Sequence, residues 1–302
     1  MDLKSKIVLI YGPTASGKSK FAVKLAKKIN GEVINADSMQ VYKELKILSA
    51  RPLQKDYKKI KHHFYGFISA KKEFSTGDWL RLVKKKILNL QKRKKVPILV
   101  GGTGLYFKAL TDGLVEIPRI PFRFRKKIRE LHKKIGSKAF FLKLKKIDKK
   151  IEGRINHLDT QRVIRAYEIK LYTKKSMYDW FKNTNSNHNK NNFFKIYVDF
   201  PKNELIERIN ERARQMLKNG AIQEVKRFIK FKIPKSRTAN KAIGMNEIKE
   251  YLDNKLEMEK LIEKISIKTR QYAKRQRTWA RGNMINWNKM NLTSLNNFLK
   301  KV

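Results

Sequence analysis

The sequence contains no cysteine, and this absence removes several chemistries at once. Disulfides, thiolate zinc sites and a cysteine nucleophile are all excluded, and the composition is typical of a reducing cytosol. Long apolar runs are also missing, since none approaches the roughly 20 residues that a membrane span requires. The apolar run near the start of the chain is too short for a signal peptide. We therefore expect a cytoplasmic protein.

Acidic residues are scarce, because 26 Asp and Glu stand against 73 Lys and Arg and the net charge is +47. Such a basic chain attracts polyanions, since its cations displace the counterions of a nucleic acid. The alternative is a compositional drift towards Lys and Asn, as in the tract NTNSNHNKNN. Composition alone favours drift for most of the excess, so a nucleic-acid partner has to be argued from where the arginines lie.

The first hundred residues alternate between apolar runs and amphipathic stretches. Residues 7–11, 32–37 and 97–100 are predicted strands, whereas 18–29 and 84–94 are predicted helices. This alternation predicts an α/β fold, in which a parallel sheet with right-handed crossovers is flanked by helices. Ligands of such sheets bind at the carboxyl ends of the strands.

The character of the sequence changes after a proline-rich joint, IPRIPF. Two basic stretches, 123–146 and 159–172, have helical spacing, and an asparagine-rich tract at 183–192 is expected to be a mobile loop. An apolar strand returns at 193–200, and residues 202–282 are expected to be mostly helical.

This order predicts an insertion between two strands of one core. The expected domains are a core of residues 1–115 and 191–302, and a helical insertion domain of residues 116–190.

The octapeptide GPTASGKS matches the pattern G-x-x-x-x-G-K-[ST] between a predicted strand and a predicted helix. Its glycines let backbone N–H groups surround an anion, and the helix N-terminus adds its positive end. Lys18 is expected to meet the terminal phosphates, and Ser19 is expected to hold Mg²⁺. The context predicts a phosphate-binding loop but does not identify the ligand. The predicted phosphate-binding residues are Gly12, Pro13, Thr14, Ala15, Ser16, Gly17, Lys18 and Ser19.

Further polar residues follow other predicted strands. Asp37 in NADSMQVY is suited to steady Mg²⁺, to cap a helix or to act as a general base, and spacing leaves these roles open. Thr103 in GGTGLYF either caps the next helix or directs its hydroxyl into the same cleft. The adjacent His62 and His63 would face opposite sides of a strand, which favours a structural role.

A stripe of cations follows one face of a predicted helix near the C-terminus. Arg270, Lys274, Arg277 and Arg281 step by 4, 3 and 4 residues through IEKISIKTRQYAKRQRTWARG, opposite a face of apolar and aromatic residues. Because few acids lie nearby, the stripe favours a nucleic-acid track over an ordinary solvated face.

Several segments, in this order, resemble the bacterial tRNA dimethylallyltransferase family. They are GPTASGKS, NADSMQVYKELKI, HHFYGF, PILVGGTGLYFKALTDGL, DTQRVIRAYE, ERARQMLKNGAIQEV and TRQYAKRQRTWARG, and they run from Ile7 to about Gly282. The resemblance is most specific in GGTGLYF and AKRQRTWARG. It implies a P-loop NTPase-like parallel sheet core with a helical insertion domain that contacts tRNA.

The resemblance also implies a reaction. The bound phosphates would belong to dimethylallyl diphosphate, whose C5 group would pass to the exocyclic amine of the adenine on the 3′ side of the tRNA anticodon. Asp37 is implied as the general base, with Thr103 and Arg212 beside the diphosphate and Mg²⁺ at Ser19. The implied protein is a monomer that extrudes the target base from its stack.

The residues that the resemblance places against tRNA lie in the strand-end loops, the insertion, the IGMNE turn and the basic helix. They are Asp37, Ser38, Met39, Gln40, Thr103, Arg125, Gln161, Arg162, Val163, Ile164, Arg165, Lys241, Ala242, Ile243, Gly244, Met245, Lys274, Arg275, Gln276, Arg277, Thr278, Trp279, Ala280 and Arg281. The chain departs from the family where Ser19 replaces a commoner Thr and where Leu158 replaces a typical Asn. A third departure, Met245, is expected to remove an aromatic platform for RNA.

Three rival functions share the phosphate loop. An adenylate isopentenyltransferase would modify a free nucleotide, and would need neither the insertion nor AKRQRTWARG. A small-molecule kinase would need a site for an acceptor hydroxyl and contacts to adenine, and the sequence indicates neither. A nonenzymatic RNA-binding module would leave Lys18, Asp37 and Thr103 without a role.

Overall fold

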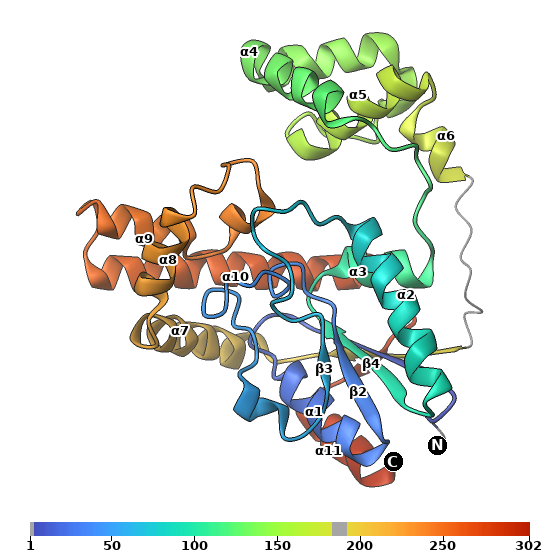
Figure 1. Ribbon diagram of the computed structural model, residues 1–302, viewed down its shortest axis with the longest axis vertical. Helices are drawn as coiled ribbons and strands as arrows, with labels where there is room; N and C mark the ends of the chain where they lie inside the picture. The colour runs from blue at the N-terminus through green and yellow to red at the C-terminus, as the bar shows by residue number, and fades with distance from the viewer. Residues whose placement is uncertain (1–2, 183–191) are drawn as a thin grey trace. The chain divides into compact units, whose positions relative to one another are not determined.

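The computed structural model of the chain describes residues 3–182 and 192–302. The chain forms two compact units, which we call the core unit (Met1–Thr111 and His188–Val302) and the helical unit (Asp112–Asn187) (Figure 1). The boundaries expected from the sequence, after residues 115 and 190, lie close to this division. The expected mobile loop at 183–192 lies outside the described residues, apart from its last position.

Over the described residues, the core unit has a six-stranded sheet of order β3-β2-β4-β1-β5-β6, and every neighbouring pair is parallel. The strands are β1 (Ile7–Tyr11), β2 (Gly31–Asn35), β3 (His62–His63), β4 (Val96–Gly101), β5 (Phe193–Val198) and β6 (Asn288–Met290). The inner strands confirm the prediction, and burial on both faces explains the continuous apolar sequences of β1 and β4. The edge strands β3 and β6 were not predicted, because such short segments show no periodicity.

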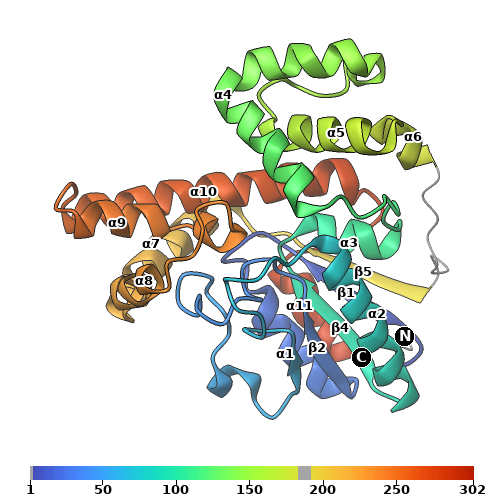
Figure 2. The same cartoon turned by 45° about the horizontal axis from the view of Figure 1, so that its top comes forward.

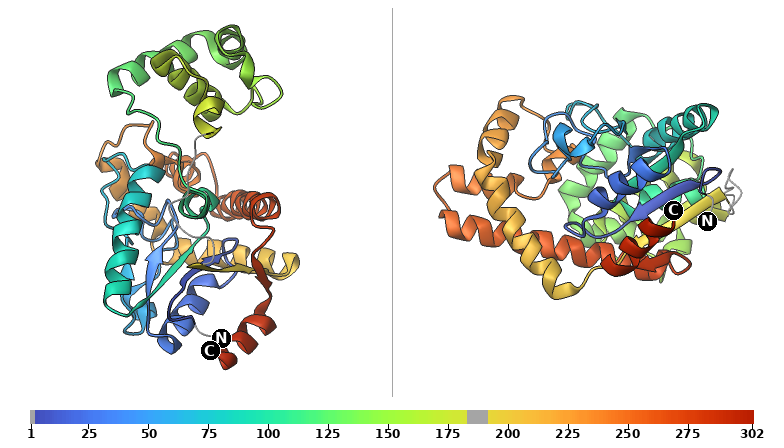
Figure 3. Two further views of the ribbon diagram at one scale, coloured as in Figure 1. Left: turned by 90° about the vertical axis from the view of Figure 1, so that its right-hand side faces the viewer. Right: turned by 90° about the horizontal axis from the view of Figure 1, so that it is seen from below.

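Helices cover both faces of this sheet (Figure 2). One apolar cluster joins one face to α2 (Thr76–Lys92), α3 (Gly104–Thr111) and the end of α10 (Met258–Asn283). Another joins the opposite face to α1 (Lys18–Lys28) and α11 (Leu292–Lys301). Leu3 belongs to the α11 cluster, so the two ends of the described chain lie close together (Figure 3).

Helix α2 begins well before residue 84, where its predicted start lay. Ser75 caps it, because the Ser75 hydroxyl accepts from the Asp78 N–H at 3.1 Å while Asp78 Oδ2 accepts from the Ser75 N–H at 2.9 Å. The sequence signal was therefore present as a capping box, S-x-x-D, and was overlooked.

The remaining helices of the core unit pack beside α10. They are α7 (Lys202–Lys218), α8 (Ala221–Lys230) and α9 (Met245–Leu252), with 3₁₀ turns at η1 (Gln54–Tyr57) and η4 (Thr238–Lys241). Helix α10 crosses the carboxyl ends of β1 and β4, since the Tyr11 hydroxyl donates to the Gln276 carbonyl at 3.0 Å. This crossing places α10 over the edge of the sheet where ligands are expected.

The helical unit has its own apolar core. Its helices are α4 (Phe122–Ile147), α5 (Thr160–Thr173) and α6 (Met177–Lys182), with a 3₁₀ turn η2 (Lys149–Ile151). The single helix predicted at 123–146 is interrupted, because Gly136 has φ 77 and kinks α4. Over the described residues of both units, no helix is long and apolar enough to cross a bilayer.

Candidate active site

The phosphate loop, residues 12–19, connects the central strand β1 to α1. Gly17 takes φ 81 immediately before α1, a left-handed conformation that favours glycine. Lys18 Nζ folds back and donates to the Pro13 carbonyl at 3.0 Å. The Ser16 hydroxyl is buried and has no hydrogen-bond partner within the described part of the chain. The loop thus has the geometry of an anion cradle with a polar group still to be satisfied.

Lys18 shares its surroundings with two other charged groups. Burial lowers the pKa of Lys18 to about 8, Asp37 acts in the opposite direction, and Arg212 lowers the pKa further. Arg212 lies on α7, where its Nη1 donates to the Thr14 hydroxyl at 3.3 Å. Lys18, Asp37 and Arg212 therefore belong to one electrostatic site, and a bound anion would offset the two cations.

Asp37 lies just beyond β2, and its carboxylate caps the turn that follows. Its Oδ1 accepts from the N–H groups of Met39 at 2.9 Å and Gln40 at 3.4 Å. The capping role considered from the sequence is therefore present, and the bonds involve one of the two carboxylate oxygens.

Asn35 fixes the backbone of Asp37, and sequence reasoning missed it. Its fully buried side chain accepts from the Asp37 N–H at 2.9 Å and donates to the Asp37 carbonyl at 3.0 Å. It also donates to the Phe64 carbonyl at 3.1 Å, while Trp79 Nε1 donates to the Asn35 carbonyl at 2.9 Å. A buried amide at the end of an apolar strand was the available signal, because such a group must find partners.

Thr103 links the ends of β4 and β2. Its hydroxyl accepts from the Ser38 N–H at 2.9 Å and lies 3.3 Å from the Ser38 hydroxyl, while its own N–H donates to the Ala36 carbonyl at 3.2 Å. Its carbonyl also accepts from the Tyr106 N–H at 3.0 Å in the first turn of α3. The hydroxyl is thus directed to the loop of Asp37, while the backbone begins the helix.

Gln276 of α10 connects the phosphate loop to GGTG. Its Oε1 accepts from the Thr14 N–H at 2.8 Å, and its Nε2 donates to the Gly102 carbonyl at 2.9 Å. Any Cβ at Gly102 would lie 2.1 Å from Gln276 Nε2, and one at Gly104 would lie 2.0 Å from Trp279 Nε1. The glycines of GGTG therefore allow the close approach of α10.

Four tyrosines interact electrostatically with Asp37. Burial raises the pKa values of Tyr11, Tyr65, Tyr106 and Tyr272, and the carboxylate of Asp37 raises each of them further. These phenols therefore stay neutral at physiological pH. Sequence reasoning did not identify this set, because its members come from four separate segments.

Glu224 of α8 anchors the chain beyond Asp37. Its buried carboxylate accepts from the N–H groups of Lys46, Ile47 and Leu48 at 2.8, 2.8 and 2.9 Å. The carboxylate of Glu224 is thus stabilised by hydrogen bonds within the protein, and these bonds fix the loop of residues 46–48.

Glu168 of α5 performs a different task in the helical unit. Its carboxylate is buried and lies 3.8 Å from Arg125 Nε, 3.4 Å from Arg129 Nε and 3.3 Å from Arg165 Nη1. The three guanidinium groups are partly exposed and share this single buried carboxylate. Arg129 was not among the predicted RNA contacts, although it lies one helical turn from Arg125.

The structure corrects part of the predicted tRNA surface. Several of the predicted residues are buried and cannot present a side chain to RNA: Val163, Ala242, Gly244, Met245, Gln276 and Ala280. Met245 packs in the apolar cluster of α8, α9 and α10, so its side chain is not part of a surface platform. Gln161, Arg162, Lys241, Lys274, Arg275, Thr278 and Arg281 are exposed. Arg125, Ile164, Arg165, Ile243, Arg277 and Trp279 are half-buried, as are Ser38, Met39 and Gln40.

The two histidines have structural partners. His62 Nδ1 lies 2.8 Å from the Ile60 carbonyl, and its ring stacks on Tyr57. His63 Nε2 lies 2.6 Å from Glu32 Oε2. Across residues 3–182 and 192–302, no group of three or more His, Cys, Asp or Glu could hold a metal ion by itself.

A parallel sheet with a phosphate loop between its central strand and α1 defines a protein of the P-loop class. The IPP transferase family model matches residues 40–283 of this chain. A tRNA dimethylallyltransferase of Pelagibacter ubique is 57% identical over 302 residues, which cover 100% of this chain and 96% of that protein. One of Allorhizobium ampelinum is 41% identical over 285 residues, which cover 94% of each.

Solved structures agree with these relatives. A tRNA isopentenylpyrophosphate transferase from Bacillus halodurans has 33% identity and a TM-score of 0.70, over 98% of this chain and 95% of that one. A eukaryotic dimethylallyltransferase acting on tRNA has 28% identity and a TM-score of 0.81, over 95% and 73% of the two chains. The chain therefore belongs to the IPP transferase family.

Proposed function

We propose that this chain transfers the dimethylallyl group of dimethylallyl diphosphate to the exocyclic amine of the adenine on the 3′ side of a tRNA anticodon. The products are N6-(dimethylallyl)adenosine in tRNA and diphosphate. One arrangement carries the proposal: Arg212 donates to the hydroxyl of Thr14 in the phosphate loop, and Lys18 of the same loop interacts electrostatically with Arg212 and Asp37. The relatives named above as tRNA dimethylallyltransferases support it over most of their length.

The chemistry needs both a base and a site for the leaving group. An aromatic amine is a weak nucleophile because its lone pair is delocalised, so a proton must leave as the new C–N bond forms. Asp37 takes that proton as general base. The C–O bond to the diphosphate breaks, and its electrons remain on the leaving group. Lys18, the loop N–H groups and Arg212 stabilise the charge that accumulates there.

The tyrosines that interact with Asp37 are suited to stabilise the positive charge that develops on the allylic carbon. The allylic carbon becomes electron-poor as the diphosphate departs, and tyrosine faces attract positive charge. Tyr106 and Tyr272 both interact with Asp37 and are candidates to border the C5 group.

We propose Mg²⁺ as a cofactor, with Ser19 as the residue that holds it. The Ser19 hydroxyl lies in the first turn of α1 beside Lys18, and this donor set fits an ion that takes its remaining ligands from phosphate and water. When bound, Mg²⁺ would neutralise charge on the departing diphosphate.

The RNA surface that we propose consists of the exposed cations and polar groups described above, together with the three arginines paired with Glu168, which are Arg125, Arg129 and Arg165. Base extrusion would bring the adenine to Asp37, since the amine cannot be reached inside a stacked loop. We further propose that the protein acts as a monomer in the cytoplasm. The absence of cysteine and the nature of the acceptor support that compartment.

A two-acceptor assay tests this function. Purified protein, Mg²⁺ and radiolabelled dimethylallyl diphosphate are incubated in parallel with unmodified tRNA and with AMP. We expect label in tRNA alone. Label in AMP would instead favour the adenylate isopentenyltransferase alternative, and phosphate transfer from ATP without prenylation would favour the kinase.

A further inference from the structure

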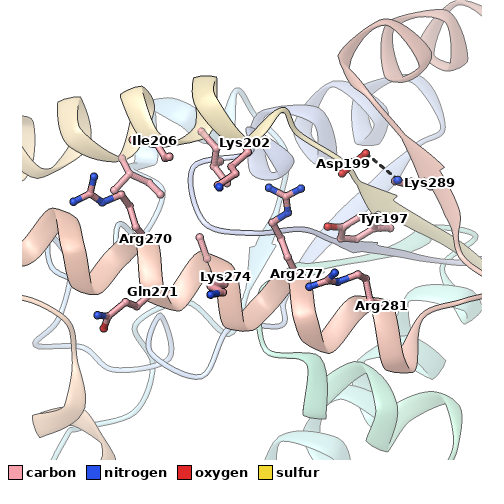
Figure 4. A pocket seen from close by; sticks show the side chains of 13 residues that line it. Tyr197, Asp199, Lys202, Ile206, Arg270, Gln271, Lys274, Arg277, Arg281 and Lys289 are labelled. Carbon is pink, nitrogen blue, oxygen red and sulfur yellow. Dashed lines mark ion pairs between the residues drawn. The ribbon is translucent and has the colours of Figure 1, made fainter.

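A recess in the core unit, separate from the phosphate loop, opens between α7 and α10 (Figure 4). Its volume is about 510 Å³, which is within the range of sites for small organic ligands. Six cations line it: Lys202, Arg270, Lys274, Arg277, Arg281 and Lys289. Asp199 also lines it, and is already paired with Lys289 at 3.3 Å. The recess therefore has a strong excess of positive charge.

The floor of the recess is apolar. Leu205, Ile209 and Ala273 line it and belong to a cluster that also contains Ala15 of the phosphate loop. This shared cluster therefore borders both the recess and the phosphate loop. Tyr197 forms one wall of the recess beside Arg277 and Arg281 (Figure 4).

Cations above an apolar floor select a particular kind of ligand. A bare anion or an RNA phosphate would gain nothing from the apolar side chains of Leu205 and Ile209, although Lys274 and Arg281 also belong to the proposed RNA surface. We propose that the recess is a second binding site, which takes a small diphosphate ester with an apolar body. Prenyl diphosphates and nucleoside diphosphates share this chemistry. The proposal does not depend on the proposed transferase function.

Equilibrium dialysis of the full chain with labelled geranyl diphosphate, ADP and inorganic diphosphate tests the site. The variant Lys202→Glu/Lys289→Glu alters the recess at positions outside the cationic stripe and outside the proposed catalytic and tRNA-binding residues. The matched control, Lys226→Glu/Lys260→Glu, changes the same charge at exposed positions on α8 and α10. Lys18→Ala weakens the phosphate loop, and thermal unfolding of each variant verifies the fold.

We expect the recess to bind one equivalent of one of the two esters in the wild type and the control, in addition to any ester bound at the phosphate loop. The recess variant should bind that equivalent at least tenfold more weakly, and Lys18→Ala should retain it. The ester that binds the recess more tightly shows whether its ligand is a prenyl diphosphate or a nucleoside diphosphate. A single equivalent that Lys18→Ala abolishes and the recess variant keeps would overturn the proposal. Equal binding of inorganic diphosphate, or selective loss of tRNA binding in the recess variant, would overturn it as well.

Gln276 supports a second inference, which rests on the proposed function. We infer that Gln276 is a positioning residue that sets the distance between the phosphate loop and GGTG. Its amide accepts from Thr14 on one side and donates to Gly102 on the other, and no charged or apolar side chain can do both. Gln276 acts on backbone groups and contacts no reacting atom.

The variants Gln276→Glu and Gln276→Met separate this role from RNA binding. We expect KM for dimethylallyl diphosphate to rise roughly tenfold, because buried hydrogen bonds that orient the loop are lost, while KM for tRNA stays unchanged. Gln91→Met, at an exposed position of α2, is the control. Thermal unfolding monitors the fold.

A rise in KM for tRNA alone would show that Gln276 contacts RNA and would overturn the inference. Affinity for inorganic diphosphate, measured without tRNA, should fall in the same variants. This second measurement distinguishes failure of the inference from failure of the proposed function.

Discussion

The core unit and the helical unit use buried polar side chains for different purposes. In the core unit, Asn35, Gln276 and Glu224 all bond to backbone groups of loops. In the helical unit, the buried carboxylate of Glu168 forms ion pairs with the side chains of three arginines. The first arrangement fixes the path of the main chain, and the second fixes where cations point.

This difference matches the ligands that we propose for the two units. A phosphate cradle is made of N–H groups, so its precision depends on loop geometry. An extended polyanion is bound by side-chain cations, so its affinity depends on how many are held in place before binding. A chain with few acids uses several of them at buried positions, which leaves the excess positive charge on the surface.

The largest effect is expected at the reacting groups of the core unit. Asp37→Ala and Asp37→Asn should lower turnover by about 10² to 10⁴-fold while tRNA still binds. Asparagine keeps an oxygen that can cap Met39 but cannot take a proton, so it separates the two roles of Asp37. Single-turnover prenylation provides the rate, and an active Asp37→Asn would show that Asp37 is only a cap.

A smaller effect, on stability, is expected at Glu224, which holds the loop of residues 46–48 outside the proposed active site. Glu224→Gln should lower the free energy of unfolding by about 2 kcal/mol, since three N–H groups lose a charged acceptor that is itself buried. Urea denaturation measures this change, and Glu204→Gln at an exposed position of α7 is the control. Equal stability of the two variants would mean that the three bonds to Glu224 add nothing.

The pH dependence of donor binding tests the electrostatics of the cradle. Lys18 is charged below its pKa of about 8, so binding above that pH must recruit a proton. Affinity for dimethylallyl diphosphate should therefore fall by up to about tenfold per pH unit above pH 8. Calorimetry in two buffers should detect the proton uptake. Lys18→Arg stays charged and should remove the dependence, whereas an unchanged slope would assign it to another group.

The smallest effect is expected in the helical unit, and its sign is the informative part. Glu168→Gln makes the chain more positive, yet should weaken tRNA binding about fivefold because the arginines are no longer held in place. Glu130→Gln adds the same charge at an exposed position and should strengthen binding slightly. Filter binding at fixed salt measures both variants, and tighter binding by Glu168→Gln would mean that net charge outweighs preorganisation.

Local patterns made the fold and several residues of the proposed site predictable. The strand–loop–helix context of GPTASGKS indicated the phosphate loop, and Asp37 and Thr103 were singled out because each follows a strand. The basic stripe of α10 was also visible as a helical period, but the sequence did not show that it borders a recess.

The sequence by itself determined which residues form the inner strands of the sheet, the phosphate loop and the cationic helix, because strand and helix periods are local. Only the tertiary structure decided which of them meet. Gln276 reaches Thr14 across 262 positions of sequence, and Glu224 reaches Lys46 across 178. Such pairs have no local signature, because any buried amide or carboxylate needs partners and the fold alone decides which backbone groups are within reach.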